Sequence, residues 1–313
     1  MKVISLFDGI SCGFVALKRA NIEIEKYIAY EIDKYAIKIS EYNFPEIEHK
    51  GDVTTEDFTK YKGFDLLIGG SPCQDLSIAK KDRKGLKGSR SCLFFEYVRA
   101  LNEIEPKYFL YENVASMSKE NKDIISKHLG VEPIMINSSL VSAQQRKRLY
   151  WTNIPNITQP IDKHIYLKDV LENGIGIDVE NQGKKICGIK IKSHSLLARD
   201  YKGFENQRQT GVAKPIRIGQ LNKGGQGQRI YSVKGKSVSL NANGGGQGAK
   251  TGLYKIDLPD GDYIVRKLTP LECERLQTLP DKYTECVSNT QRYKCIGNGW
   301  TVDVIAHILN HIK

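Results

Sequence analysis

The sequence lacks the features of disulfide-stabilised, metal-binding and membrane proteins. Its seven cysteines are odd in number and widely spread without a C-x-x-C pair, so neither a disulfide framework nor a zinc knuckle is indicated. No uncharged apolar run approaches the roughly 20 residues that span a bilayer, and the N-terminus is a poor secretory signal. His307 and His311 lie four residues apart, but no further ligand is near them. We therefore expect a cytoplasmic protein with no metal site.

Positive charge is concentrated in two parts of the chain. Hydrophobic residues make up 40% and charged residues 27% of the 313 residues, which is ordinary for a globular protein with a buried core. Of the net charge of +11, most lies in residues 181–256, which hold 15 Lys or Arg against two acids. A second basic cluster covers residues 80–90. Both clusters could be solvated surface, but such concentration suits a polyanion, and double-stranded nucleic acid is the clearest candidate.

Short apolar runs alternate with amphipathic stretches from residue 2 to about 158. The alternation predicts strands separated by helices, and therefore a doubly wound α/β fold whose mostly parallel sheet is covered on both faces. The strand-like runs are VISLF, YIAYEI, FDLLIGG, YFLYENV, EPIMINSSLV and LYWTNI. The helix-like stretches lie near residues 11–20, 33–43, 91–105 and 119–129.

Residues 159–265 differ from the rest in being Gly-rich and basic, without helical periodicity. The runs IRIGQL and RIYSV predict short strands joined by turns, although the glycine runs between them could be flexible linkers. Beyond this segment, Thr269 before Pro270 predicts the start of a helix, and TVDVIAHILNHI predicts an apolar-faced helix that packs on the first domain. We expect a first domain of residues 1–158 plus 266–313 and a smaller, loop-rich domain of residues 159–265.

Candidate ligand-binding residues follow the first two of these strand-like runs and a further candidate strand just before Asp52. LFDGISCG is a Gly-containing turn at a strand end, where α/β sheets bind nucleotides, but such turns are common. Glu31 lies 22 residues after Gly9, where a carboxylate takes ribose hydroxyls in dinucleotide folds. Asp52 could similarly reach an adenine amino group. An ordinary helix cap explains either acid equally well.

Candidate catalytic residues follow later strands. Cys73, in IGGSPCQDLS, comes just after a strand, although a lone cysteine is more often buried and inert. Glu112 ends the strand YENV, and Arg146 and Arg148 alternate along QQRKRLYW and so share one face. A thiol, a carboxylate and a guanidinium at neighbouring strand ends favour a nucleophilic site.

The order and spacing of these motifs resemble those of the DNA cytosine-5 methyltransferases. The first half is most similar to the catalytic domains of animal de novo DNA methyltransferases, and the second half looks like bacterial and phage enzymes. Asp8 and Cys12 depart from the usual residues of the first motif. The resemblance rests on FDG, Glu31, Asp52, SPC, LFFE, ENV, QRKR, RKLTPLECERLQTLP and GNGW.

The resemblance implies a Rossmann-like methyltransferase that uses S-adenosylmethionine on a cytosine flipped out of duplex DNA. Cys73 would add to C6, Glu112 would contact N3, and Arg148, with Arg146, would steady O2. Cofactor contacts are implied for Phe7, Gly9, Glu31, Asp52, Val53, Pro72, Leu93, Asn298 and Trp300. DNA contacts are expected from Lys80, Lys81, Arg83, Lys84, Lys87 and Arg90 in a mobile loop, and from Arg208, Arg217 and Arg229.

Three other interpretations share part of this evidence. A tRNA cytosine-5 methyltransferase has SPC and ENV, but a basic insertion of about a hundred residues suits duplex DNA better. A silent DNA-binding regulator would not need Cys73, Glu112 and Arg148 together. A small-molecule enzyme of the same fold would have no use for the positive segment. We expect a monomer, associated with the nucleoid through DNA and compatible with a separately encoded restriction endonuclease.

Overall fold

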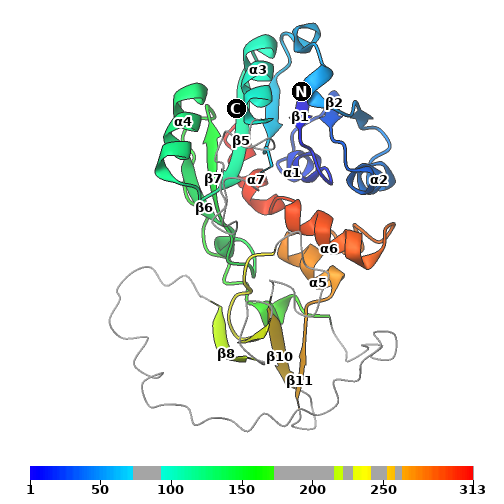
Figure 1. Ribbon diagram of the computed structural model, residues 1–313, viewed down its shortest axis with the longest axis vertical. Helices are drawn as coiled ribbons and strands as arrows, with labels where there is room; N and C mark the ends of the chain where they lie inside the picture. Colours follow the sequence, from blue (N-terminus) through cyan, green and yellow to red (C-terminus); the bar gives the residue numbers. More distant parts are fainter. Residues whose placement is uncertain (73–92, 173–214, 221–227, 241–251, 258–262, 313) are drawn as a thin grey trace.

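The computed structural model describes residues 1–72, 93–172, 215–220, 228–240, 252–257 and 263–312. In these ranges the chain forms two β-sheets, which lie toward opposite ends of the long axis of the molecule (Figure 1). Helices surround the larger sheet, and α5 and α6 lie between it and the smaller one. None of the described helices is long and apolar enough to cross a membrane.

The larger sheet has seven strands in the order β3-β2-β1-β4-β5-β7-β6. All of its strands run in one direction except β7, which is antiparallel to both neighbours. The predicted doubly wound, mostly parallel sheet is therefore confirmed. The strands are β1 (Lys2–Leu6), β2 (Lys26–Tyr30), β3 (Glu48–His49), β4 (Leu66–Gly69), β5 (Tyr108–Val114), β6 (Ile134–Asn137) and β7 (Lys147–Thr152).

Helices cover both faces of this sheet, because successive strand residues point to opposite sides. Val3 and Ile68 pack with α1, α2 and α7, whereas Ile4, Leu67 and Trp151 pack with α3 and α4. The helices are α1 (Cys12–Arg19), α2 (Lys34–Asn43), α3 (Phe94–Ile104), α4 (Lys119–Leu129), α5 (Pro270–Leu276), α6 (Asn289–Asn298) and α7 (Val302–Leu309). The four helices predicted in the first half are all present.

Side-chain caps fix where several helices begin. The Asp33 side chain accepts a hydrogen bond from Tyr35 N at the start of α2. Thr269 caps α5 by accepting from Glu272 N, while the Glu272 carboxylate accepts from Thr269 N, and Pro270 occupies the first turn. Each such cap typically contributes about 1 kcal/mol. The helix start predicted at Thr269 is confirmed.

The smaller sheet has four described strands in the order β11-β10-β9-β8. Tyr231 and Tyr254 from this sheet pack with Leu276 of α5 and Ile296 of α6 in a separate hydrophobic core. IRIGQL and RIYSV both contain strands, as predicted. The strands are β8 (Ile216–Gln220), β9 (Arg229–Ser232), β10 (Leu253–Asp257) and β11 (Tyr263–Arg266).

The C-terminal helix α7 packs on α1, in agreement with the prediction that it returns to the first part of the chain. Val302, Ile305 and Ile308 are fully buried in the core shared with α1, and each such side chain contributes about 1.5–3 kcal/mol by burial. At the rim of this contact, Arg19 forms an ion pair of 2.6 Å with Asp303. The segment before α7 is thereby brought next to the ends of β4 and β5.

Candidate active site

One edge of the larger sheet collects most of the candidate residues. The loops after β1, β2, β4 and β5 leave the sheet at this edge, because these strands are parallel. β7 is antiparallel, so its beginning reaches the same edge, and Arg148 is paired in register with Val114. This reversal explains how a motif at the start of one strand can meet a motif at the end of another.

The loop after β1 has an unusual backbone. Phe7, Gly9 and Ser11 have φ angles of 59°, 63° and 57°, in the left-handed region. For the two non-glycine residues this conformation costs about 1–3 kcal/mol each, so other contacts must hold it. Asp8 supplies them, since its carboxylate accepts hydrogen bonds from Ser11 Oγ at 2.6 Å and Tyr27 OH at 2.7 Å.

Glu31 connects the end of β2 to this loop. Its Oε2 accepts from Gly9 N at 2.9 Å, and its Oε1 accepts from the backbone N–H groups of Ile32 and Asp33 at 2.8 Å. Burial raises the pKa of the Glu31 carboxyl above its ordinary value, and the three N–H donors oppose this shift. The carboxylate is therefore held rigidly beside the backbone of Gly9.

Asp52 and Val53 lie on the neighbouring loop. The exposed Asp52 carboxylate accepts hydrogen bonds from Thr54 N and Thr54 Oγ1, both at 2.9 Å, as an ordinary cap does. Val53 is buried, and its carbonyl accepts from Arg99 of α3 at 2.9 Å. Phe7, Leu93 and Pro72 are half-buried, and the first two pack against the same core as Val53.

The chain that leaves β4 is tied to β5 just before Cys73. Ser71 is buried, and its hydroxyl forms a 2.6 Å hydrogen bond with Tyr111 OH. Asn113 donates to the Ser71 carbonyl at 3.4 Å and to Tyr111 OH at 3.1 Å. Cys73 itself lies outside the described residues, but the chain that carries it leaves the sheet beside the end of β5.

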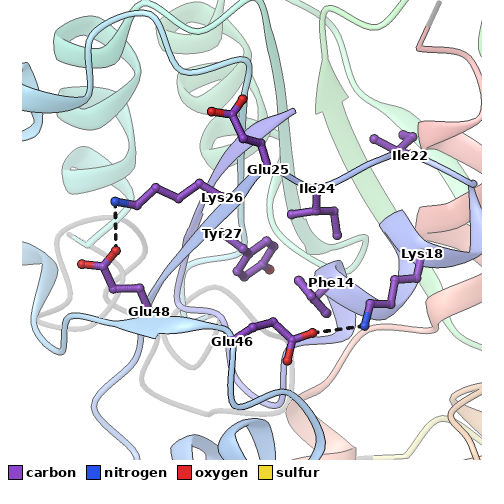
Figure 2. A pocket seen from close by; sticks show the side chains of 9 residues that line it. All are labelled: Phe14, Lys18, Ile22, Ile24, Glu25, Lys26, Tyr27, Glu46 and Glu48. Atoms are coloured by element: carbon purple, nitrogen blue, oxygen red, sulfur yellow. Dashed lines mark hydrogen bonds and ion pairs between the residues drawn. The ribbon is translucent and has the colours of Figure 1, made fainter.

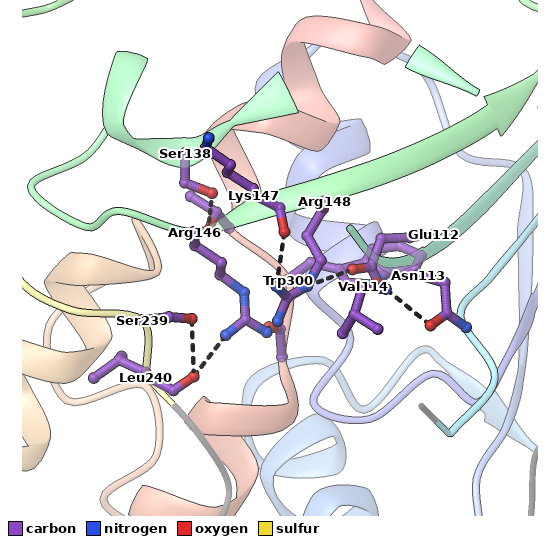
Figure 3. Close-up of polar contacts among 12 residues, drawn as sticks. Glu112, Asn113, Val114, Ser138, Arg146, Lys147, Arg148, Ser239, Leu240 and Trp300 are labelled. Atoms are coloured by element: carbon purple, nitrogen blue, oxygen red, sulfur yellow. Dashed lines mark hydrogen bonds and ion pairs between the residues drawn. The ribbon is translucent and has the colours of Figure 1, made fainter. Parts of the chain in front are cut away.

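Glu112, Arg148 and Trp300 meet at this edge (Figure 3). Arg148 Nε lies 2.8 Å from Glu112 Oε1, and Trp300 Nε1 donates to Glu112 Oε2 at 3.0 Å. The side chains of the ion pair are only 16% and 11% exposed, so water screens the pair weakly. Both oxygens of the Glu112 carboxylate are thus held by N–H donors from different segments.

Arg146 makes different contacts from Arg148. It is 5% exposed and donates to the Leu240 carbonyl at 2.8 Å and to the Gly299 and Gly297 carbonyls at 3.1 and 3.3 Å. In Figure 3 its guanidinium points toward Leu240, away from Glu112. Arg146 therefore joins the segment that carries most of the smaller sheet (residues 159–265, here called the small-sheet segment) to the turn before Trp300.

Two of the basic residues expected to contact DNA lie among the described residues. Arg217 on the edge strand β8 is exposed and donates to the Gln220 side chain. Arg229 begins β9 opposite Gln220, and its buried Nε has no hydrogen-bond partner among the described residues. Outside the described residues lie Lys80, Lys81, Arg83, Lys84, Lys87, Arg90 and Arg208.

A surface pocket lies at the opposite edge of the sheet (Figure 2). It is lined by Phe14 and Lys18 of α1 and by residues at the start of β2, including Lys26. Lys18 is paired with Glu46 at 3.2 Å, and Lys26 with Glu48 at 3.1 Å. No candidate residue lines the pocket, so it is separate from the edge where the candidate residues gather.

Comparison with known proteins identifies the family. A family model described as C-5 cytosine-specific DNA methylase matches residues 1–313. The chain belongs to this family. It is therefore a DNA cytosine-5 methyltransferase, and S-adenosylmethionine is its methyl donor.

Bacterial and phage enzymes are among the relatives of this methylase, in agreement with the resemblance noted above. The type II methyltransferase M.HhaI of Haemophilus parahaemolyticus is 31% identical over 331 residues, covering 100% of this chain and 94% of the relative. The orphan methyltransferase M.SPRI of Bacillus phage SPR is 26% identical, covering 100% and 97%. Among solved structures, the methyltransferase EhMeth of Entamoeba histolytica has a TM-score of 0.70 at 17% identity, covering 99% and 97%. This last likeness shows a shared fold.

The described residues of the methylase fit S-adenosylmethionine. The space above Gly9 is open, since a side chain there would meet no heavy atom within 4 Å. Glu31 offers a fixed carboxylate and Asp52 an exposed one, which suit hydroxyl and amino donors. Phe7 and Leu93 add apolar surface. Among the residues that the structure describes, no group of three or more His, Cys, Asp or Glu side chains could hold a metal ion.

Two residues of this site and several contacts of the predicted ones were not foreseen from the sequence. Tyr111 and Ser71 hold the chain before Cys73, although neither has an unusual position in the sequence pattern. Asn298, predicted at the cofactor site, is the exposed last residue of α6, a helix that no apolar periodicity had indicated. Trp300 was assigned to the same site, and its hydrogen bond to Glu112 had no signal in the sequence.

Proposed function

We propose that this methylase transfers the methyl group to C5 of a cytosine turned out of double-stranded DNA, with a covalent bond between Cys73 and C6. The observation that supports this best is the Glu112 carboxylate, held by Arg148 and Trp300 beside the chain that leads to Cys73. A flipped base could be contacted there on one side by the thiol and on its polar edge by Glu112 and Arg148.

In this proposal each residue has a separate task. The Cys73 thiolate attacks C6, and the electron pair of the C5–C6 double bond moves toward C5 and the ring. Glu112 contacts the N3 edge of the base, and Arg148 directs its guanidinium toward O2. After methylation a base removes the C5 proton, the double bond re-forms and the thiolate leaves. Arg146 supports this arrangement from behind, since its guanidinium is bound to three backbone carbonyls.

The same proposal assigns the cofactor contacts. When bound, S-adenosylmethionine supplies an electrophilic methyl group. Glu31 would hold the ribose hydroxyls and Asp52 the adenine amino group. Apolar contact would come from Phe7, Val53, Pro72 and Leu93, while Gly9 leaves room at the loop, and Asn298 and Trp300 lie on the C-terminal side.

We further propose that residues 159–265 recognise the DNA sequence. This part of the chain contains most of the excess positive charge and the β8–β10 strands, which are separate from the catalytic edge. Arg217 and Arg229 are its described basic candidates, and the loop of residues 80–90 would close over the backbone. Arginine can read guanine with two hydrogen bonds, whereas other basic residues would hold phosphates.

The chemistry can be tested with a cytosine analogue. A duplex with 5-fluorocytosine at the target should trap the wild-type enzyme covalently, because the atom that must leave C5 cannot be removed as a proton. Cys73→Ser should neither methylate nor be trapped, since a serine hydroxyl is a far weaker nucleophile than a thiolate. Cys286→Ser is a matched control, because that thiol is half-buried beside the Lys38 carbonyl, outside the proposed site.

The substrate is tested in the same assay. Transfer of labelled methyl groups to duplex DNA and to tRNA is compared, and bisulfite sequencing of plasmid from expressing cells identifies the methylated site. Methylation of tRNA alone, or full activity of Cys73→Ser, would refute the proposal.

A further inference from the structure

The indole of Trp300 contacts Glu112 rather than only lining the cofactor site. Its Nε1–H donates to Glu112 Oε2 at 3.0 Å, while Arg148 binds the other oxygen from β7. An indole nitrogen can only donate, so this group is suited to holding an acceptor such as a carboxylate oxygen. We propose that Trp300 is a positioning residue that fixes the orientation of the Glu112 carboxylate. This inference rests on the proposed function, in which Glu112 contacts the target base.

Trp300 is itself held in place on both sides. The preceding Gly299 carbonyl accepts from Arg146 Nη2 at 3.1 Å and from Gln277 Nε2 at 3.0 Å. The following Thr301 donates its hydroxyl to Gln277 Oε1 at 2.9 Å and accepts from Ser138 at 2.9 Å. Gln277, Thr301 and Ser138 are at most 2% exposed. The indole is thus attached to a rigid, buried hydrogen-bond network and not to a loose terminus.

The backbone just after β4 passes directly against this hydrogen bond. A Cβ atom at Gly70 would lie 3.0 Å from Glu112 Oε2 and 3.3 Å from Trp300 Nε1, closer than most real contacts. Glycine therefore lets the chain that leads to Cys73 pass Glu112 and Trp300 without displacing either side chain. Gly70, which lies against the Trp300–Glu112 hydrogen bond, precedes the proposed nucleophile Cys73 by three positions in the chain.

Loss of the Trp300 donor should affect catalysis through geometry. With Arg148 alone, the Glu112 carboxylate keeps a bond to one oxygen and can rotate about it. Catalytic contacts are sensitive to displacements of about 1 Å, so a freer carboxylate should slow the chemical step. Cofactor affinity should change little, because phenylalanine at this position would keep an aromatic ring.

The test compares Trp300→Phe with Trp151→Phe. These are the two tryptophans of the chain, and Trp151 also donates its indole N–H, to Ser126 Oγ at 2.9 Å in the core beneath α4. For each variant, kcat, the KM for duplex DNA, the Kd of S-adenosylmethionine and the rate of trapping by 5-fluorocytosine DNA are measured. Trp300→Phe should lower kcat and the trapping rate about tenfold or more, with the cofactor Kd changed less than about threefold. Trp151→Phe should keep kcat within about twofold of the wild type.

A stability measurement makes the test independent of activity. In urea unfolding, the effects of Trp300→Phe and Glu112→Ala should be less than additive, because either change removes the same hydrogen bond. Trp151→Phe and Glu112→Ala should be additive. If the wild type is trapped by the analogue but Trp300→Phe has an unchanged kcat, or loses only cofactor affinity, the inference is wrong while the proposed function stands. A wild type that is never trapped would instead refute the proposed function, and the unfolding measurements would still decide whether Trp300 holds Glu112.

Discussion

Replacement of Glu31 should weaken cofactor binding by a predictable amount. The carboxylate is fixed by N–H groups of Gly9, Ile32 and Asp33, so it needs little reorganisation to accept ribose hydroxyls. Hydrogen bonds to a charged group contribute about 1.5–3 kcal/mol, which corresponds to roughly a 10- to 150-fold increase in Kd for Glu31→Ala. Glu25→Ala is a matched control, because that acid lies at the opposite edge of the sheet and pairs only loosely with Lys2 at 3.5 Å.

Cofactor binding should also depend on pH in a direction set by Glu31. Burial raises the pKa of this carboxyl above its ordinary value of 4.5, and hydroxyl donors bind the ionised form. Affinity should therefore fall as the pH drops through the raised pKa, and Glu31→Gln should lack this dependence. The effect on folding has the opposite sign: stability from this group is fully present below pH 4.5 and is lost as the pH rises through the folded-state pKa.

Isothermal titration calorimetry with S-adenosylmethionine between about pH 5 and pH 8 measures the Kd of Glu31→Ala and the pH dependence of cofactor binding. A Kd for Glu31→Ala within twofold of the wild type would refute the assigned contact. A pH dependence that is the same in Glu31→Gln would show that another group titrates.

Two further predictions concern the connection between the catalytic edge and the small-sheet segment. Arg146→Met should lower the free energy of unfolding in urea by about 2–4 kcal/mol, because three buried carbonyls lose a charged donor. As a control, Arg19→Met at a partly exposed ion pair should lower it by about 1 kcal/mol or less. Equal losses in the two variants would contradict the proposal that Arg146 supports the site. Exchange of residues 159–265 for the same segment of a relative with another specificity should move the methylated site, mapped by bisulfite sequencing, and an active chimera that keeps the original site would place recognition elsewhere.

Much of the fold could be predicted because it depends on local patterns. Apolar runs of strand length, separated by amphipathic stretches, predicted six strands of the larger sheet and four of the helices that cover it. Thr269 with Pro270 predicted the start of a further helix. The direction of β7 could not be read from its sequence, since an apolar strand has the same pattern in both directions. That reversal decides that Arg148 meets the end of β5.

The charged residues of the candidate site could be predicted from the sequence, but the groups to which they hydrogen-bond could not. Arg146 and Arg148 look equivalent along an extended segment, yet Arg146 donates to carbonyls of residues 240, 297 and 299. A backbone carbonyl gives no sequence signal, because every residue has one. The bond from Trp300 to Glu112 joins residues 188 positions apart, a separation at which periodicity has no information.

The junction between the catalytic edge and the small-sheet segment suggests how specificity can change without loss of chemistry. Ser237 N donates to the Ala143 carbonyl at 2.7 Å, Gln145 N donates to the Ser237 carbonyl at 3.0 Å, and Leu240 N donates to Gln144 Oε1 at 2.8 Å. In these bonds the segment of residues 159–265 contributes backbone atoms, while the buried side chains Gln144 and Arg146 come from the catalytic side. Backbone groups are retained whatever side chains they carry, so under the proposed division of labour the residues that read DNA could vary while the contact that supports Trp300 and Glu112 is preserved.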